Sequence, residues 1–347
     1  MSGFDVFLGN EKLITRLRRD ILRGSLAHAY IIEGDEGCGK RTLARLICAA
    51  DSCCENEPPC MECINCSKIA RGQSPDVITV TPEKDRVQIT VDTIRKLCEN
   101  VSFAPNDLAK KYFIIPNAGA MNEQAQNALL KTLEEPPAHV MFLLLCENSD
   151  ELLSTIRSRA PILRVQVLSD ELISKQLLLT NTDAKALYEC DRDAFDAIIK
   201  LSRGSLGRAI ALTDKKSASE CLERYKKAER YLELLSERRG SANELQFHEF
   251  SVKLAKGRAE ISEIYVLIAD AIRDLIACKL CNNAHTVFYR SEETARAVSD
   301  KFALGTLIKL TDVFIGARNA IERNMNINLS MMQTSVAAVN ATRTSRK

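Results

Sequence analysis

The sequence predicts an α/β protein: a parallel sheet in the N-terminal half, followed by a helical C-terminal half. A short apolar strand at 30–33 runs into a glycine-rich turn, and a helix opens directly behind it. The segments 111–115 and 140–145 are apolar on both faces, as buried parallel strands are. After residue 169, apolar residues recur at helical spacing. With 347 residues, the chain is long enough for two or three domains.

Apolar periodicity and breaker residues predict the individual elements. In the first half we expect helices at 13–26 and 41–50, a strand at 77–80, and a strand end that passes into a helix over 89–97. The strand at 111–115 follows, then an amphipathic helix in the stretch 122–137, closed by the two prolines at its end, and the strand at 140–145. In the second half we expect short helices at 172–179, 185–187 and 195–202, and longer ones at 222–239, 245–256, 261–280 and 302–324. The polar run 214–219 predicts a linker between two helical parts.

The glycine-rich turn fits the pattern of a phosphate-binding loop. Gly34, Gly37 and Gly39 allow backbone N–H groups to converge on an anion, and Lys40 adds a positive charge at the start of the helix. One position departs from the pattern: Arg41 stands where Ser or Thr should give Mg²⁺ a hydroxyl ligand, and Thr42 follows one place late. The loop therefore predicts descent from a nucleotide-binding loop, and it leaves present-day ATP binding open.

The acidic residues of a P-loop ATPase are absent from their expected place. In such enzymes the strand corresponding to 111–115 ends in Asp-Glu; the Asp holds Mg²⁺ and the Glu orients the attacking water. Here Pro116 and Asn117 follow the strand. We therefore expect no intrinsic ATPase activity. The alternative is an active ATPase that uses Thr42 with Glu147 or Asp150, which follow the strand 140–145.

A cluster of cysteines follows the helix expected at 41–50. Two residues separate Cys60 from Cys63 and Cys63 from Cys66, and Cys53 or Cys54 supplies a fourth thiolate. Four thiolates suit a structural Zn²⁺ with no open coordination position. An iron–sulfur cluster is the rival, but ferredoxin spacing continues to a further Cys followed by Pro, which is not found here. Thiols without metal are the third interpretation.

Composition excludes several classes of protein. The 48 basic and 46 acidic residues leave a net charge of +2, and aromatic residues are 5% of the chain, so a zinc-module nucleic-acid binder is a weak alternative. The sequence contains no run of about 18 apolar residues, so we expect no membrane span. The N-terminus lacks the basic-then-apolar layout of a secretory signal. The 13 cysteines beside a phosphate-binding loop indicate a reducing compartment, and we expect a cytoplasmic protein.

Three further motifs resemble those of a known family. Residues 127–137, Asn-Ala-Leu-Leu-Lys-Thr-Leu-Glu-Glu-Pro-Pro, resemble the signature helix of the AAA+ clamp-loader subunits of bacterial DNA polymerase III. Residues 155–160, Thr-Ile-Arg-Ser-Arg-Ala, are similar to that family's Ser-Arg-Cys motif, with Ala160 in place of Cys. Residues 203–209 resemble its sensor-2 region, although the ATPase subunits carry Arg where Gly207 stands. The cysteine cluster resembles the family's zinc module.

The resemblance implies a role and a set of partners. Arg159 would be an arginine finger that acts in trans on the ATP site of a neighbouring subunit, and Ser158 would position it. The partners would be the ATPase subunits gamma or tau and the delta subunit, with the sliding clamp and primer–template DNA reached through the complex. The resemblance also implies a RecA-like AAA+ domain at 1–165 that contains the zinc module (about 53–66), a helical lid at 166–213 and a helical collar domain at 218–347.

Overall fold

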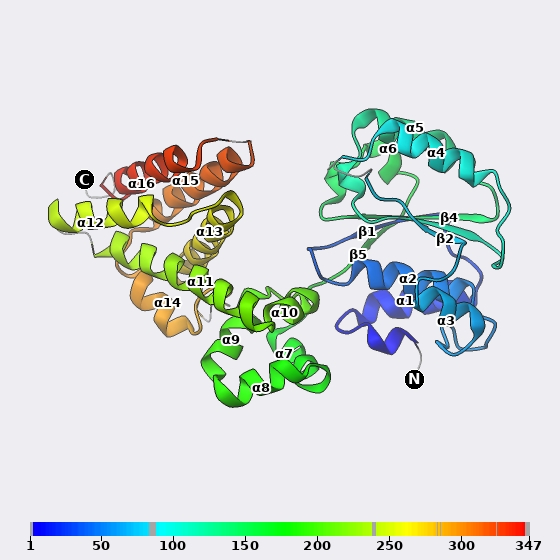
Figure 1. Ribbon diagram of the computed structural model, residues 1–347, viewed down its shortest axis with the longest axis horizontal. Coiled ribbons are helices and arrows are strands. Elements are labelled where there is room, and N and C mark those ends of the chain that lie inside the picture. The colour runs from blue at the N-terminus through cyan, green and yellow to red at the C-terminus, as the bar shows by residue number, and fades with distance from the viewer. Residues whose placement is uncertain are drawn as a thin grey trace. The chain divides into compact units, whose positions relative to one another are not determined.

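The computed structural model describes residues 3–82, 88–237, 241–282, 284, 286–323 and 325–343. Its residues form two compact units. The first comprises residues 1–176 together with 204–208, and the second comprises residues 177–203 and 209–347. The described part of the first unit holds the sheet, and that of the second is helical (Figure 1).

The first unit is built on a five-stranded parallel sheet with the order β2-β3-β4-β1-β5. The strands are β1 (Ala29–Glu33), β2 (Val77–Thr79), β3 (Lys111–Ile115), β4 (Val140–Cys146) and β5 (Ile162–Arg164). The three central strands are β3, β4 and β1, and they are almost wholly buried. Such continuous apolar strands require cover on both faces. The parallel sheet predicted from the sequence is therefore confirmed.

Helices cover both faces of the sheet (Figure 1). Side chains from alternate positions along each strand enter opposite cores, as the two-residue period of a strand requires. One core includes Ile32 and Leu143 and packs against α1 (Glu11–Leu22), α2 (Lys40–Asp51) and α3 (Ile64–Ala70). The other includes Ile31 and Phe142 and packs against α4 (Val91–Val101), α5 (Glu123–Glu134) and α6 (Ser154–Arg157).

The second unit contains a helical bundle around its own core. The helices of the C-terminal half are α7 (Asp170–Thr180), α8 (Thr182–Cys190), α9 (Arg192–Leu201), α10 (Leu206–Leu212), α11 (Lys215–Ser236), α12 (Ser241–Val252), α13 (Arg258–Leu280), α14 (Glu292–Ser299), α15 (Leu304–Glu322) and α16 (Ile327–Arg343). Helix α13 carries the apolar segment predicted to cross a bundle, and it packs extensively against α15 and α11. In the described part of the chain, no helix has both the length and the apolar character needed to cross a membrane.

The linker predicted at 214–219 is wrong. Helix α11 begins at Lys215, and the Asp214 side chain caps it by accepting hydrogen bonds from the N–H and the hydroxyl of Ser217. The polar residues therefore form the first turn of a long helix. Acidic and hydroxyl side chains favour helix N-termini as much as loops, because they satisfy N–H groups that have no partner within the helix.

Candidate functional site

The glycine-rich turn connects β1 to α2, as the phosphate-binding pattern requires. Gly37 and Gly39 have φ values of +76° and +99°, in the left-handed region that side chains with a Cβ rarely adopt. Gly39 is the residue that precedes the first turn of α2. The sequence therefore places its glycines where the backbone turns most sharply, and the loop has the strand-to-helix context of a phosphate-binding loop.

The Lys40 ammonium is engaged by the loop itself. It donates hydrogen bonds to the carbonyl oxygen of Gly34 and, at 2.9 Å, to that of Asp35. A phosphate-binding lysine would instead direct its ammonium toward the phosphate oxygens. An anion at this loop would therefore have to break two hydrogen bonds to recruit Lys40. Thr42 is exposed on α2.

The segment Gly204–Arg208 packs against the glycine-rich turn at Gly37. The Gly207 N–H donates to the Gly37 carbonyl oxygen at 3.4 Å. A Cβ built on Gly37 would lie 2.3 Å from Ser205 Oγ, and one on Gly207 would lie 3.1 Å from the Gly37 oxygen. Backbone thus packs against backbone, and only glycine permits this approach. The sequence had indicated Gly204 and Gly207 only as part of the sensor-2 region, so this contact was not predicted.

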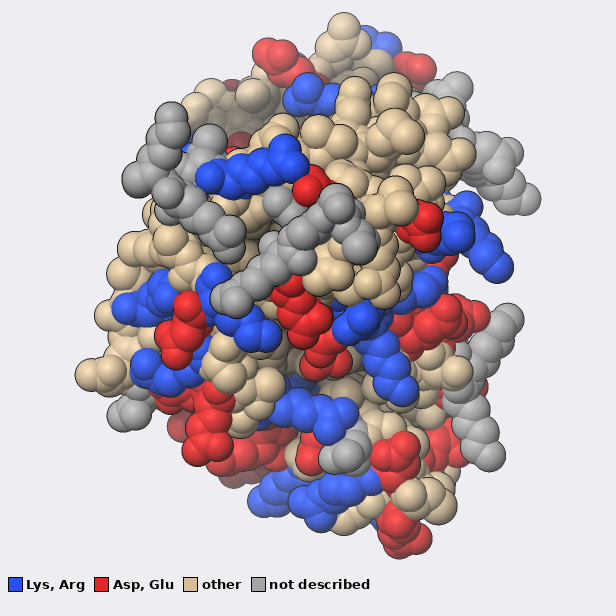
Figure 2. Space-filling model, turned by 90° about the vertical axis from the view of Figure 1, so that its left-hand side faces the viewer, with Lys and Arg blue, Asp and Glu red and all other residues tan. Residues whose placement is uncertain are grey.

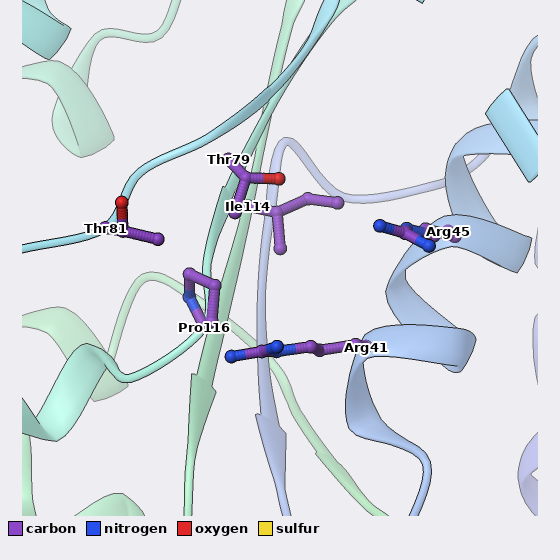
Figure 3. Close-up of a pocket in the computed structure, with 6 residues that line it drawn as sticks. All are labelled: Arg41, Arg45, Thr79, Thr81, Ile114 and Pro116. Carbon is purple, nitrogen blue, oxygen red and sulfur yellow. The ribbon is translucent and has the colours of Figure 1, made fainter. Parts of the chain in front are cut away.

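The end of β3 carries no carboxylate. Pro116, which follows the strand, is half-buried and lies with Ile114 opposite the arginines of α2 (Figure 3). Arg41 and Arg45 extend from that helix toward the strands. Two guanidinium groups disfavour a divalent cation at this place by simple charge repulsion.

Glu147 and Asp150, the two acids of the alternative ATPase hypothesis, follow β4. Asp150 forms an ion pair with Arg157, and its side chain is largely exposed. Burial, and then the nearby Glu147 carboxylate, raise the pKa of Glu151. The ion pair of Asp150 with Arg157 engages one of the two acids that the alternative ATPase would use.

The Arg159 guanidinium lies at the surface beside the end of α5. Its Nη2 donates to Glu134 Oε1 at 2.6 Å, and its Nη1 donates to the Thr155 carbonyl oxygen at 2.8 Å and to Ser158 Oγ at 3.3 Å. Ser158 Oγ in turn donates to the same Thr155 oxygen at 3.0 Å. The guanidinium is thus oriented by three groups while its side chain stays 33% exposed. Sequence reasoning placed Ser158 next to Arg159 but did not predict Glu134 as its partner.

Four of the predicted cysteine ligands come together. The sulfur atoms of Cys53, Cys60, Cys63 and Cys66 all lie within 4.8 Å of one another, and those of Cys60 and Cys66 are 3.9 Å apart. A tetrahedral zinc with bonds of about 2.3 Å would separate its sulfur ligands by about 3.8 Å. Cys54 is exposed and outside this group. The cluster can therefore hold a metal ion, with Cys53 in the position that the sequence left open.

Backbone N–H groups point at two of the four sulfur atoms, those of Cys60 and Cys63. The Cys63 N–H donates to Cys60 Sγ at 3.2 Å, and the Cys66 N–H donates to Cys63 Sγ at 3.5 Å. Burial raises the pKa of Cys63, but hydrogen bonds from the backbone near Cys66 and Cys54 outweigh it and lower that pKa to about 6. Turns whose N–H groups point at sulfur are typical of structural zinc sites, because they stabilise the anionic ligand.

Part of the first unit is similar to a known protein family. Residues 9–169 match the family model described as "DNA polymerase III, delta subunit". This match covers less than half of the 347 residues of the chain. This range contains the glycine-rich turn, the cysteine cluster and the Arg159 site.

Two of the relatives that the chain resembles are subunits of DNA polymerase III. Over 214 residues the chain is 34% identical to the DNA polymerase III subunit tau of Salmonella typhimurium, covering 61% of this chain and 33% of that protein. It is 30% identical to the subunit gamma of Buchnera aphidicola subsp. Acyrthosiphon pisum, covering 61% of this chain and 58% of that one. The matched regions thus span between a third and three fifths of these relatives.

Among solved structures, the chain is similar to a DNA polymerase III gamma subunit-related protein from Thermotoga maritima. The identity is 19% and the TM-score 0.44, with 95% of this chain and 99% of that chain covered.

Proposed function

We propose that this chain is the delta-prime type of subunit of a bacterial DNA polymerase III clamp loader: an AAA+ subunit that hydrolyses no ATP itself and presents Arg159 to a neighbouring subunit. The proposal rests on the Arg159 geometry. A guanidinium at the surface, oriented by Glu134, Ser158 and the Thr155 carbonyl, is available to a partner. The relatives named tau and gamma support a place in the same assembly.

The proposed chemistry is electrostatic. During ATP hydrolysis, negative charge develops on the oxygens of the transferred phosphoryl group, and an arginine supplied in trans stabilises it by about 10³–10⁵ in rate in well-studied cases. Arginine suits this role because its planar fork of N–H donors matches phosphate oxygens. To reach them, Arg159 would exchange the Glu134 carboxylate for phosphate. An exposed ion pair of this kind costs at most about 1 kcal/mol to break.

The chain's own nucleotide loop supports a non-hydrolysing role. Lys40 is engaged by loop carbonyls, Gly37 is packed against the segment Gly204–Arg208, and Pro116 replaces the acid that would hold magnesium. We expect weak or absent ATP binding for the same reasons.

The proposed partners and domains follow the same assignment. The partners are the gamma or tau ATPase subunits and the delta subunit, with the sliding clamp and primer–template DNA contacted through the complex in the cytoplasm. We assign residues 1–165 to the AAA+ domain, 166–213 to a helical lid and 218–347 to a collar domain. The cysteine cluster would hold a structural Zn²⁺, with Cys53, Cys60, Cys63 and Cys66 as ligands.

An active ATPase subunit is the second candidate, because the relatives named above are tau and gamma subunits. Direct nucleic-acid binding has less support. On the face shown in Figure 2, the described basic side chains are interspersed with acidic ones, whereas a DNA-binding face usually gathers positive charge.

Two measurements on the purified full chain test the proposal. Steady-state ATP turnover by the chain alone should be at background, and size-exclusion chromatography with a purified gamma or tau subunit should give a shared complex. Brisk turnover by the isolated chain would favour the active ATPase. Failure to enter any complex would reject the assembly role.

A further inference from the structure

Helix α5 contacts both ends of the segment that carries Arg159. Near the C-terminal end of the helix, Glu134 pairs with the Arg159 guanidinium. About two turns earlier, the Gln126 side chain reaches the loop that leads into α6. Both contacts lie on the face of the sheet where α5 packs against α6 (Figure 1). The Glu134 contact orients the guanidinium, whereas the Gln126 contact holds the backbone that carries it.

The Gln126 amide is buried, and its hydrogen bonds use both its donors and its acceptor. The residue is 4% exposed. Its Nε2 donates to the carbonyl oxygens of Met121 and Glu151, both at 3.1 Å, and its Oε1 accepts from the Leu153 N–H at 2.8 Å. The reverse orientation of the amide would place its N–H groups against the Leu153 N–H and its oxygen against two carbonyl oxygens. The backbone partners therefore fix the orientation of this side chain.

These hydrogen bonds fix the start of α6. Leu153 is the residue before the first turn of that helix, and its apolar side chain cannot cap the helix. Its carbonyl oxygen accepts from the N–H groups of Ile156 and Arg157, at 3.0 and 3.1 Å. The Ile156 oxygen in turn accepts from the Arg159 N–H at 3.0 Å. An unbroken series of hydrogen bonds therefore runs from Gln126 to the backbone of Arg159.

Apolar packing alone would hold this segment less strictly. Leu152, Ile156 and Ala160 are buried in the core that α5 also covers. Apolar burial has no preferred direction, whereas a hydrogen bond weakens when its distance or angle changes. Without the Gln126 amide, the Leu153 N–H would lose its partner, and the segment would gain freedom to shift.

We propose that Gln126 is a positioning residue for the arginine finger. It sets the backbone of residues 151–159, and so the place from which Arg159 reaches a neighbouring subunit. The inference rests on the proposed function, because Gln126 affects ATP turnover only through Arg159. The expected effect is large, since a misplacement of about 1 Å can cost about 100-fold in rate.

Hydrogen exchange of the isolated full chain, read by mass spectrometry, tests whether Gln126 holds this segment. Gln126→Met keeps the length of the side chain and removes all three hydrogen bonds. We expect the amides of residues 149–160 to exchange about tenfold faster, while those of β3 and β4 keep the wild-type rate. Gln124→Met is the matched control, since Gln124 is an exposed glutamine of the same helix, and it should exchange as the wild type does. Unchanged exchange at 149–160 in Gln126→Met would overturn the proposal.

ATP turnover by a complex with gamma or tau subunits tests the effect on the arginine finger. Gln126→Met should lower turnover at the neighbouring site at least about tenfold, and Gln124→Met should leave it unchanged. In the Arg159→Ala background, Gln126→Met should have no further effect, because the two residues act as one unit. An equal fall in both backgrounds would indicate general damage to the fold and would overturn the proposal.

The same variants distinguish failure of this inference from failure of the proposed function. If Arg159→Ala lowers turnover but Gln126→Met, shown by circular dichroism to be folded, does not, only the positioning role of Gln126 is rejected. If Arg159→Ala leaves turnover unchanged, the arginine finger and the positioning role are both rejected. Should Gln126→Met not fold, Gln126→Leu repeats the measurements with a second apolar side chain of similar volume.

Discussion

Arg159 illustrates how a surface side chain can be ordered without being buried. Its guanidinium is fixed by the Glu134 carboxylate and by groups of its own turn, yet a third of the side chain faces solvent. The contacts within the turn fix its direction, and the carboxylate holds it by an exchangeable ion pair. Under the proposed role, in which Arg159 exchanges the Glu134 carboxylate for a phosphate, this combination of orientation and low cost is what the side chain needs.

Asp76 is the buried carboxylate that anchors the start of β2. It is fully buried, and its oxygens accept hydrogen bonds from the backbone N–H groups of Asn106, Asp107 and Leu108 and from the Asn106 side-chain amide, at 2.7 to 3.0 Å. Burial alone would raise its pKa, but these hydrogen bonds outweigh burial and lower it. Asp76 therefore ties β2 to the loop that leads into β3.

This lowered pKa predicts a pH-dependent contribution to stability. Because the folded pKa lies below the ordinary value of about 3.9, the stabilisation is present above that value and is lost as the pH falls through the folded pKa. At neutral pH, Asp76→Asn should lose about 3 kcal/mol in the free energy of unfolding, since its amide group would face N–H donors. Urea unfolding followed by circular dichroism would measure this.

The difference between wild type and Asp76→Asn should shrink in acid, from about pH 4 downward. A difference that stays constant between pH 7 and pH 3 would contradict this account of Asp76.

Substitutions at two glycines, Gly24 and Gly37, test whether the segment Gly204–Arg208 packs on the glycine-rich turn. Gly24 and Gly37 both have positive φ, but a Cβ on Gly24 would meet nothing, whereas one on Gly37 would overlap Ser205. Gly24→Ala should therefore cost about 1 kcal/mol for backbone strain alone, and Gly37→Ala about 3 kcal/mol. Thermal or urea unfolding of the two variants measures the difference. Equal losses would show that the segment Gly204–Arg208 does not pack on this turn.

At the scale of elements, the cysteine module supports the start of the chain. Gly3 N–H donates to the Pro59 carbonyl oxygen at 2.7 Å, and a Cβ on Gly3 would overlap Met61. Phe7, a few residues on, lies against Gly39 of the glycine-rich turn. The module thus packs, through the N-terminal segment, toward the loop before α2, and its folding should matter beyond its own residues.

The neighbouring residues Cys53 and Cys54 allow a test of which cysteine is the fourth metal ligand. The wild-type chain should contain one zinc, and Cys53→Ser should lose it, because Cys53 lies within the four-sulfur group. Cys54→Ser, its neighbour outside the group, should keep the zinc and the wild-type stability. Elemental analysis of purified protein, with thermal unfolding before and after chelation, would measure both effects. A metal-free, fully folded wild type would contradict the zinc assignment, and the reverse pattern would assign Cys54 as the ligand.

The sequence predicted the buried strands better than the edges of the fold. The limits of β3 were predicted as they stand, because a run that is apolar on both faces admits few alternatives. β5 was missed, since it has only three residues and ends in Arg164. The helix-capping role of Asp214 was misread as a linker, because the same residue types favour both.

The arrangement of the candidate site was only partly predictable, for a related reason. Local spacing predicted the turn at Gly37 and the grouping of the cysteines. The contact of Gly37 with Ser205 and the pairing of Arg159 with Glu134 join residues far apart in the chain. No periodicity or motif in one sequence records such pairings, because tertiary packing decides them.

At the scale of the whole molecule, the chain combines a sheet domain, whose nucleotide loop is closed, with a unit of helices that has its own core. Under the proposed function, a fold that keeps the strand–loop–helix frame without the magnesium ligands would perform no ATP hydrolysis of its own. Its value to an assembly would lie in surfaces and in the groups that it presents to neighbours. Arg159 is the group for which the described residues make this case most directly.

ATP turnover by a reconstituted complex with gamma or tau subunits, in which only this chain is varied, tests the central claim most directly. Arg159→Ala should reduce turnover at the neighbouring site by at least about 10³-fold, because the phosphoryl oxygens lose their guanidinium. Lys40→Ala should leave turnover unchanged, as should Arg157→Ala, an equally exposed arginine of the same motif. Unchanged turnover with Arg159→Ala, or a large fall with Lys40→Ala, would contradict the account.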